Sequence, residues 1–197
     1  GYRRGKVLHL KDIVDEAVHG CDCVEKVLVV RRSQTELLPC QMTEGRDFWY
    51  HEVSSNKSSS HEAERMDSED LLFMLYTSGT TGKPKAAIIT HINAVHSVLG
   101  FTAAMALSTK ERAIVAVPIS HITGLIALVM TVVGNAGLLV VMDEFKAENF
   151  IKTAEEEKIT YTLIVPAMLQ LLLLSNDVAG ADLSNWRTCG FGGSIMP

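Results

Sequence analysis

The residues best suited to chemistry form one polar loop. Nine consecutive residues are glycines, hydroxyl-bearing residues, lysines or proline: Thr77, Ser78, Gly79, Thr80, Thr81, Gly82, Lys83, Pro84 and Lys85. Glycines let the backbone turn tightly and expose successive N–H groups, while the hydroxyls and lysines add donors and positive charge. Such a loop suits a di- or triphosphate, since each charge-assisted hydrogen bond contributes about 1.5–3 kcal/mol. An ordinary polar turn is the alternative, but the run contains no acidic and no apolar residue, which favours anion binding.

This loop differs from the Walker phosphate loop. The Walker pattern places four residues between glycine and Gly-Lys, then a serine or threonine, and it opens a helix. Here two residues separate Gly79 from Gly82, and Pro84 follows Lys83. The flanking runs 71–76 and 86–90 are apolar and too short for helices. The sequence therefore predicts a hairpin loop that binds phosphates between two strands.

Three further residues are candidates for a ligand pocket. His121 follows an apolar run and could border a pocket, or it could be a buried histidine satisfied by a backbone carbonyl. Gly192 and Gly193 could let a ligand approach the backbone closely, or they could form an ordinary turn. No metal site is predicted, because none of the four cysteines has zinc-ligand spacing and Cys21-x-Cys23 suits two thiols on a surface turn.

Composition limits the class of protein that carries these residues. The chain has 197 residues, with 18 basic and 23 acidic residues and a formal net charge of −5. A general nucleic-acid binder or a polybasic membrane protein would usually carry a positive charge, so we expect neither as a partner. The cysteine usage and the absence of a signal-peptide pattern favour a reducing, cytoplasmic setting. Both ends are expected to lie inside a longer protein.

Alternating strands and helices are expected to position these residues. Strands are predicted at 24–30, 71–76, 86–90, 113–117, 137–141, 161–165 and 187–191. Helices are predicted at 10–18, from 91 to about 106, at 124–133, from about 147 to 157 and at 166–174. In the second helix Ile92, Val95, Leu99, Thr102 and Ala106 share one face, and Thr90 is placed to cap it. The pattern predicts an α/β fold with largely parallel sheets flanked by helices.

Two segments bear on domain organisation. Residues 52–70 are polar and unpatterned, which predicts a surface loop and a division into portions 1–70 and 71–197. Residues 113–142 carry no charged side chain, which raises the question of a membrane span. Interruptions by Pro118, Gly124, Gly134 and other polar or glycine residues instead favour a buried strand–helix–strand unit.

Residues 76–85 resemble the signature loop of the adenylate-forming (ANL) superfamily, which includes acyl-CoA synthetases, luciferases and peptide-synthetase adenylation domains. Residues 118–124 resemble its Pro-x-x-His-x-x-Gly stretch, and residues 191–197 resemble its Gly-Gly-Ala-x-x-Pro stretch. The resemblance covers nearly the whole chain, as part of the large N-terminal domain of an AMP-dependent acyl-CoA synthetase. Up to Lys85 it is strongest for acetyl- and propionyl-CoA synthetases. From His91 onward it is strongest for medium- or long-chain and generic acyl-CoA ligases. Natural divergence and recombination are the two explanations for this mixture.

The resemblance implies a two-step ligase that uses ATP, Mg²⁺ and coenzyme A. A carboxylic acid would be converted to an acyl-adenylate with release of pyrophosphate, and then to an acyl-CoA with release of AMP. The residues implied in holding the β and γ phosphates are Thr77, Ser78, Gly79, Thr80, Thr81, Gly82 and Lys85. Lys83 would point to solvent, His121 would border the carboxylate and acyl pocket, and Gly192 and Gly193 would border adenine or the acyl group.

Several elements of the superfamily are missing from these 197 residues. They are the Tyr-Gly-x-Thr-Glu stretch that meets Mg²⁺, the aspartate that holds the ribose, and the C-terminal domain with its catalytic lysine. No catalytic residue is therefore assigned here, and the chain alone is expected to bind nucleotide weakly without useful turnover. The alternatives are another class of nucleotide enzyme and a catalytically silent nucleotide-binding or scaffold fragment. The acid and the oligomeric state stay open.

Overall fold

The computed structural model describes residues 2–3, 6–31, 40–77 and 85–193. They fall into two compact units, Gly1–Glu64 and Arg65–Pro197. The interpretation of residues 71–197 as a nucleotide-binding portion stays a prediction.

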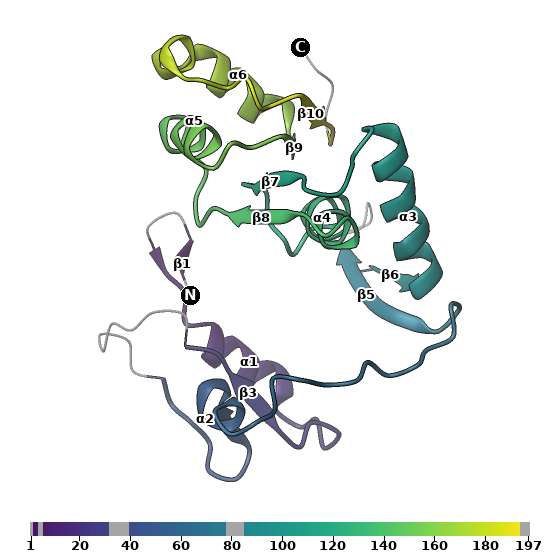
Figure 1. Cartoon of the computed structure of the whole chain (residues 1–197). Helices are drawn as coiled ribbons and strands as arrows, with labels where there is room; N and C mark the ends of the chain where they lie inside the picture. The colour runs from purple at the N-terminus through teal and green to yellow at the C-terminus, as the bar shows by residue number, and fades with distance from the viewer. Residues whose placement is uncertain (1, 4–5, 32–39, 78–84, 194–197) are drawn as a thin grey trace. The chain divides into compact units, whose positions relative to one another are not determined.

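A four-stranded parallel sheet organises the second unit (Figure 1). Its strands are β7 (Arg112–Val115), β8 (Leu138–Val141), β9 (Tyr161–Ile164) and β10 (Thr188–Phe191), in the order β10-β9-β7-β8. All three strand pairs are parallel, and Tyr161 lies opposite both Ala113 and Thr188. All four residues of β9 are buried, as expected of a strand covered on both faces. The predicted parallel α/β architecture is confirmed.

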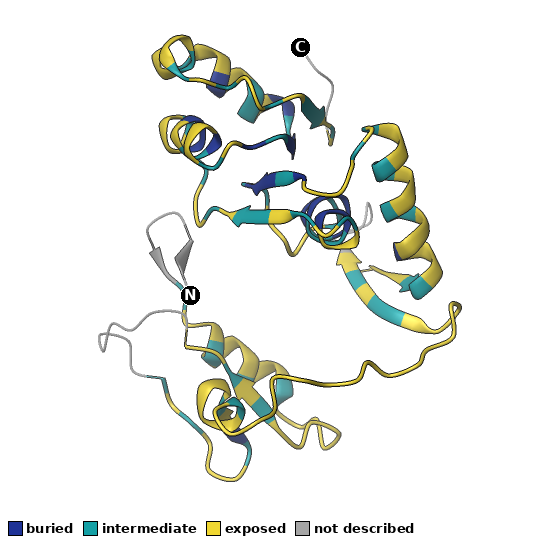
Figure 2. Cartoon of the chain, in the orientation of Figure 1, coloured by how far each residue is buried: buried dark blue, intermediate teal, exposed yellow. Residues whose placement is uncertain are grey.

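Helices cover both faces of this sheet, so the core has two layers (Figure 2). They are α3 (His91–Ala104), the π-helix η1 (Thr123–Met130), α4 (Thr131–Gly134), α5 (Ala147–Glu156), α6 (Pro166–Leu174) and the short 3₁₀ helix η2 (Asn176–Gly180). One apolar cluster joins the sheet to η1, α4 and α3 through Ala113, Tyr161 and Leu128. The other joins it to α5 and α6 through Ile114, Phe150 and Leu172.

The uncharged segment 113–142 folds as the predicted strand–helix–strand unit. It runs from β7 through η1 and α4 to β8. Across the described ranges, no helix is long and apolar enough to cross a membrane.

Helix α3 confirms the predicted element and its cap but presents the opposite face to the core. Thr90 forms a capping box with Asn93, whose backbone N–H donates to the Thr90 hydroxyl at 3.4 Å. Ile92, Val95 and Leu99 are exposed, by 42%, 56% and 62%, while Ala94 is buried. Because α3 is apolar around most of its circumference, periodicity alone does not select the buried face, and packing against η1 and α4 decides it.

The strands that flank the candidate phosphate loop form an antiparallel hairpin. β5 (Leu71–Thr77) pairs with β6 (Lys85–Thr90), and Thr77 lies opposite Lys85 at the loop end. The predicted hairpin, in place of a loop that opens a helix, is confirmed. Helix α3 follows β6 directly, and its first N–H groups donate to the carbonyls of Asp70 and Ser68 at 3.1 and 2.8 Å.

The first unit is smaller. It contains β1 (Tyr2–Arg3), β2 (Lys6–Val7), α1 (Leu10–Val18), β3 (Val27–Val29), β4 (Asp47–Trp49) and α2 (Tyr50–Ser54). β3 and β4 are parallel. Gly20 adopts φ +75° just after α1, which confirms the predicted helix end. The strand expected at 24–30 is shorter, and the loop expected from residue 52 begins after α2.

A buried carboxylate connects α1 to β4 in this unit. Asp47 accepts from Lys11 Nζ and Arg46 Nε, each at 2.6 Å, and from the Thr43 N–H at 2.8 Å. Arg46, Lys11 and this N–H hold the pKa of Asp47 well below its usual range, against the opposing effect of burial. The ion pairs therefore stabilise the unit down to low pH.

Candidate functional site

The parallel sheet brings two predicted stretches to the same edge. The segment with His121 follows the carboxyl end of β7, and Gly192 and Gly193 follow the carboxyl end of β10. Only β9 lies between these strands, so their axes are roughly 10 Å apart at ordinary strand spacing. Ligands of open α/β sheets bind outside the carboxyl ends of the strands. This edge is the candidate site.

His121 is exposed, so the interpretation of it as a buried histidine is wrong. Its ring Nδ1 accepts the backbone N–H of Thr123 at 3.3 Å and lies 3.1 Å from the Thr123 hydroxyl. Because Nδ1 accepts an N–H, the neutral ring carries its proton on Nε2. His121 can therefore donate from Nε2 to an oxygen of a bound acid or phosphate.

Gly124 lets η1 begin directly against the segment that carries His121. A Cβ at this position would lie 2.4 Å from the Pro118 carbonyl oxygen and 2.9 Å from Ile119 Cα. The last position of the Pro-x-x-His-x-x-Gly stretch therefore has to be glycine, because any side chain there would collide with the backbone of Pro118 and Ile119. The sequence analysis did not predict this role of Gly124. The available signal was the fixed spacing between Pro118 and Gly124 in the stretch.

The Gly192-Gly193 pair combines a turn with open space. Gly193 has φ +86°, a conformation that favours glycine, and Gly192 donates its N–H to the Ile164 carbonyl at 3.3 Å. A Cβ at Gly192 would meet no atom within 4 Å. The turn interpretation therefore holds for Gly193, while Gly192 leaves room for a ligand to approach the backbone.

The candidate phosphate loop is described only at its two ends. The backbones of Thr77 and Lys85 pair across the hairpin, and Lys85 is exposed. Ser78, Gly79, Thr80, Thr81 and Gly82 lie outside the described residues. Their role in holding phosphates stays a prediction.

A hollow of about 380 Å³ lies at the carboxyl end of β8 and contains none of the predicted site residues. Its lining residues are Val140, Val141, Met142, Asp143, Glu144, Asn149 and Thr153. The hollow therefore does not replace the candidate site.

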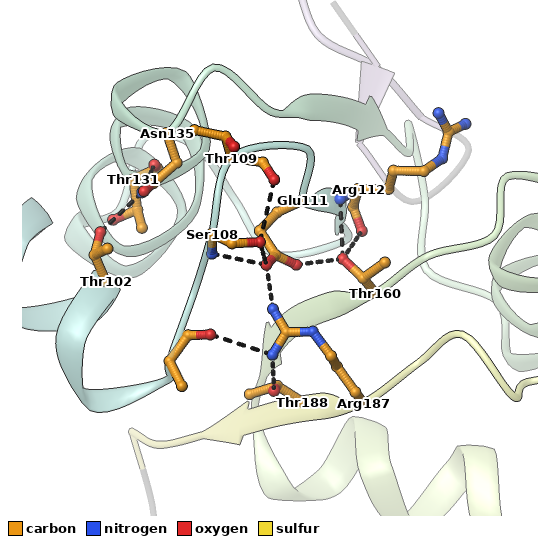
Figure 3. Close-up of polar contacts among 11 residues, drawn as sticks. Thr102, Ser108, Thr109, Glu111, Arg112, Thr131, Asn135, Thr160, Arg187 and Thr188 are labelled. Carbon is orange, nitrogen blue, oxygen red and sulfur yellow. Dashed lines mark hydrogen bonds and ion pairs between the residues drawn. The ribbon is translucent and has the colours of Figure 1, made fainter.

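A buried polar cluster lies at the opposite, amino edge of the sheet, which the sequence did not indicate (Figure 3). Glu111, 2% exposed, accepts from the Ser108 N–H at 2.9 Å and from the Thr160 hydroxyl at 2.5 Å, and it forms an ion pair with Arg187. Burial raises the pKa of Glu111, but hydrogen bonds from Thr160 and Ser108 and the charge of Arg187 outweigh it, so the pKa lies below its usual range. The cluster joins the segments that precede β7, β9 and β10.

We expect Glu111→Gln to reduce the unfolding free energy at pH 7 by about 2 kcal/mol. The substitution removes the ion pair with Arg187 and weakens the acceptor of the Thr160 hydroxyl. Because the pKa of Glu111 is lowered on folding, its charged form stabilises the wild type fully above the unfolded-state pKa, and this stabilisation is lost as pH falls through the folded-state pKa. Urea unfolding at pH 7, 4 and 3 should thus show a shallower pH dependence in the variant.

The matched control is Glu157→Gln, which removes the half-exposed carboxylate paired with Arg112 at 2.7 Å. It should cost less than about 1 kcal/mol, since exposed ion pairs contribute little. Equal losses in the two variants would contradict a special role for the buried carboxylate.

The comparison with known protein families matches residues 7–197 to the model of AMP-binding enzymes. The chain belongs to the AMP-binding enzyme family. The predicted family and fold are confirmed, and the hairpin loop and both stretches at the sheet edge lie inside the matched range.

Curated relatives in this family include acetyl-CoA synthetases. The chain is 56% identical over 90 residues to that of Streptomyces avermitilis, covering 46% of this chain and 13% of the relative. It is 47% identical over 112 residues to that of Methanothrix thermoacetophila, covering 56% and 16%. The chain therefore spans only a small part of these relatives' length.

Two solved structures agree with the fold. The inhibitor-bound N-terminal domain of FACL13 from Mycobacterium tuberculosis superposes with TM-score 0.66 at 28% identity, covering 74% of this chain and 36% of that one. ATP-bound MatB from Rhodopseudomonas palustris gives 0.67 at 23% identity, covering 74% and 28%. The second likeness supports the fold alone.

Proposed function

We propose that the intact protein activates a carboxylic acid with ATP, as an AMP-forming acid–thiol ligase. The acid oxygen attacks the α-phosphorus, the bond to the bridging oxygen breaks, and pyrophosphate leaves. The thiol of coenzyme A then takes the acyl group and AMP is released. The observation that carries this proposal is the antiparallel hairpin that brackets residues 78–84 within a chain of the AMP-binding family.

The loop is proposed to bind the β and γ phosphates through Thr77, Ser78, Gly79, Thr80, Thr81, Gly82 and Lys85. Negative charge grows on the departing pyrophosphate, and donors fixed at those oxygens lower the barrier. The exposed Lys85 at the base of the hairpin supplies positive charge beside the loop. Mg²⁺ would be held largely by the phosphates, since this ion usually binds few protein carboxylates and keeps several waters.

The sheet edge is proposed to hold the acid and the nucleoside. His121 would donate from Nε2 to the carboxylate, and the open space at Gly192 would admit adenine or the acyl group. The acetyl-CoA synthetase relatives make acetate the first acid to test, followed by longer acids. We also propose a cytoplasmic location, because the four cysteines are free thiols, as is usual in a reducing compartment.

Exchange of labelled pyrophosphate into ATP tests the proposal on the intact protein. We expect exchange that requires both ATP and an acid. An NTPase would instead release phosphate without any acid, and a scaffold would show neither exchange nor a rise in melting temperature with ATP. Either of those results would overturn the proposed function.

A further inference from the structure

The π-helix η1 determines where His121 lies. The Leu125 N–H donates to the His121 carbonyl at 2.9 Å, and the Thr123 N–H donates to the His121 ring. Both donors lie in the first turn of η1. The Leu125 bond spans four residues, as in an α-helix, whereas the Thr131 N–H reaches the Ile126 carbonyl five residues back, as in a π-helix. A change of winding near Thr131 would therefore shift the first turn of η1.

Two buried hydroxyls hold consecutive carbonyls within η1. Tyr161, fully buried on β9, donates its hydroxyl to the Ala127 carbonyl at 2.6 Å. Thr131, also fully buried, donates its hydroxyl to the Ile126 carbonyl at 2.8 Å, where its own N–H also bonds. These bonds lie next to the change from π to α winding between Met130 and Thr131. The two hydroxyls therefore donate to the Ile126 and Ala127 carbonyls, whose backbone partners depend on the winding of the helix.

Tyr161 connects η1 to the centre of the sheet. Its strand, β9, pairs with both β7 and β10, whose carboxyl ends lead to the two halves of the candidate site. Burial keeps the pKa of Tyr161 above its usual value, so the hydroxyl stays a donor across the physiological range. The carbonyl it binds is only six residues beyond His121.

We propose that Tyr161 is a positioning residue for His121: its hydroxyl fixes the π winding of η1, and the first turn of η1 in turn fixes the imidazole. The effect on His121 geometry stands on these contacts alone. The effect on catalysis rests on the proposed function, in which His121 donates to the acid.

The test compares Tyr161→Phe with Thr162→Val in the intact protein. Thr162 is the next residue of β9, is equally buried, and donates its hydroxyl to the Ile114 carbonyl at 3.0 Å. Successive strand residues face opposite sides of a sheet, so its loss removes one buried hydrogen bond away from η1. Both variants should lower the melting temperature by similar amounts.

Only Tyr161→Phe should alter His121. The readout is the ¹⁵N NMR spectrum of the His121 imidazole, assigned by comparison with His121→Asn. In Tyr161→Phe the Nδ1 and Nε2 resonances should lie closer together, because Nδ1 loses the fixed N–H donor of Thr123. KM for the acid should rise about fivefold while kcat stays within about twofold, the size expected for one misplaced hydrogen bond. Thr162→Val should change neither readout.

Unchanged His121 resonances in a folded Tyr161→Phe variant would overturn the inference. If that variant fails to fold, Thr131→Val, which removes the neighbouring donor, decides by the same readouts. If the wild-type protein shows no acid-dependent pyrophosphate exchange, the proposed function fails, and the resonances still decide the positioning role.

Discussion

Gly124→Ala should destabilise residues 65–197 by about 3 kcal/mol, as measured by urea unfolding. The added Cβ would meet the Pro118 carbonyl oxygen at 2.4 Å and Ile119 Cα at 2.9 Å. Both are backbone atoms, so no side-chain rotation relieves the contact. Relief requires η1 to separate from the segment between Pro118 and His121, and buried Gly124 lies within the packed core.

Gly100→Ala provides the matched control. Gly100 lies inside α3, and a Cβ there would meet nothing within 4 Å. Alanine in an exposed helix interior should increase stability by about 0.5–1 kcal/mol. The two substitutions are chemically identical, and their effects on the free energy of unfolding should have opposite signs. A Gly124→Ala variant as stable as the wild type would show that the close approach to Pro118 is not required.

Local patterns in the sequence predicted most elements of residues 65–197. Alternating apolar runs and amphipathic helices indicated the parallel sheet, Thr90 indicated the start of α3, and Gly20 indicated the end of α1. The two apolar runs around the polar loop indicated the hairpin. In each case the signal lies within a few residues of the feature, so one sequence contains it.

Features that depend on distant residues were not predictable. Glu111 and Arg187 are separated by 76 positions, and no local pattern shows that they form an ion pair. Ile92 and Leu99 share a helical face that stays exposed, because other elements select which apolar face of α3 is buried. The mostly apolar run 123–134 predicts a helix but does not distinguish a π-helix from an α-helix, and the Tyr161 hydroxyl that bonds to the Ala127 carbonyl comes from a distant strand.

The candidate site shows the same limit. The sequence identified His121 and the Gly192-Gly193 pair, and the order of the parallel strands explains why they share one edge. Exposure of His121 and its bond from Thr123 could not be inferred from spacing. Each depends on how η1 packs against the segment after β7.

The combined substitution of Thr80→Ala and Lys85→Ala should reduce pyrophosphate exchange of the intact protein by at least 100-fold. Removing a single donor to a developing oxyanion costs about 10²–10³ in rate, and this variant removes a hydroxyl and a charge. The melting temperature without nucleotide should change little, because Lys85 pairs with Thr77 through the backbone and both substitutions retain the backbone of the hairpin.

ATP provides the second readout of this variant. A ligand at 100 times its dissociation constant stabilises the folded state by about 2.7 kcal/mol, so ATP should raise the melting temperature of the wild type. The double variant should lose most of that rise, because it lacks a hydroxyl and a charge from the proposed phosphate-binding loop. Lys83→Ala, in the same loop, is the control and should keep both exchange and the ATP-dependent rise. An equal rise in the double variant would mean that the hairpin loop does not hold the phosphates.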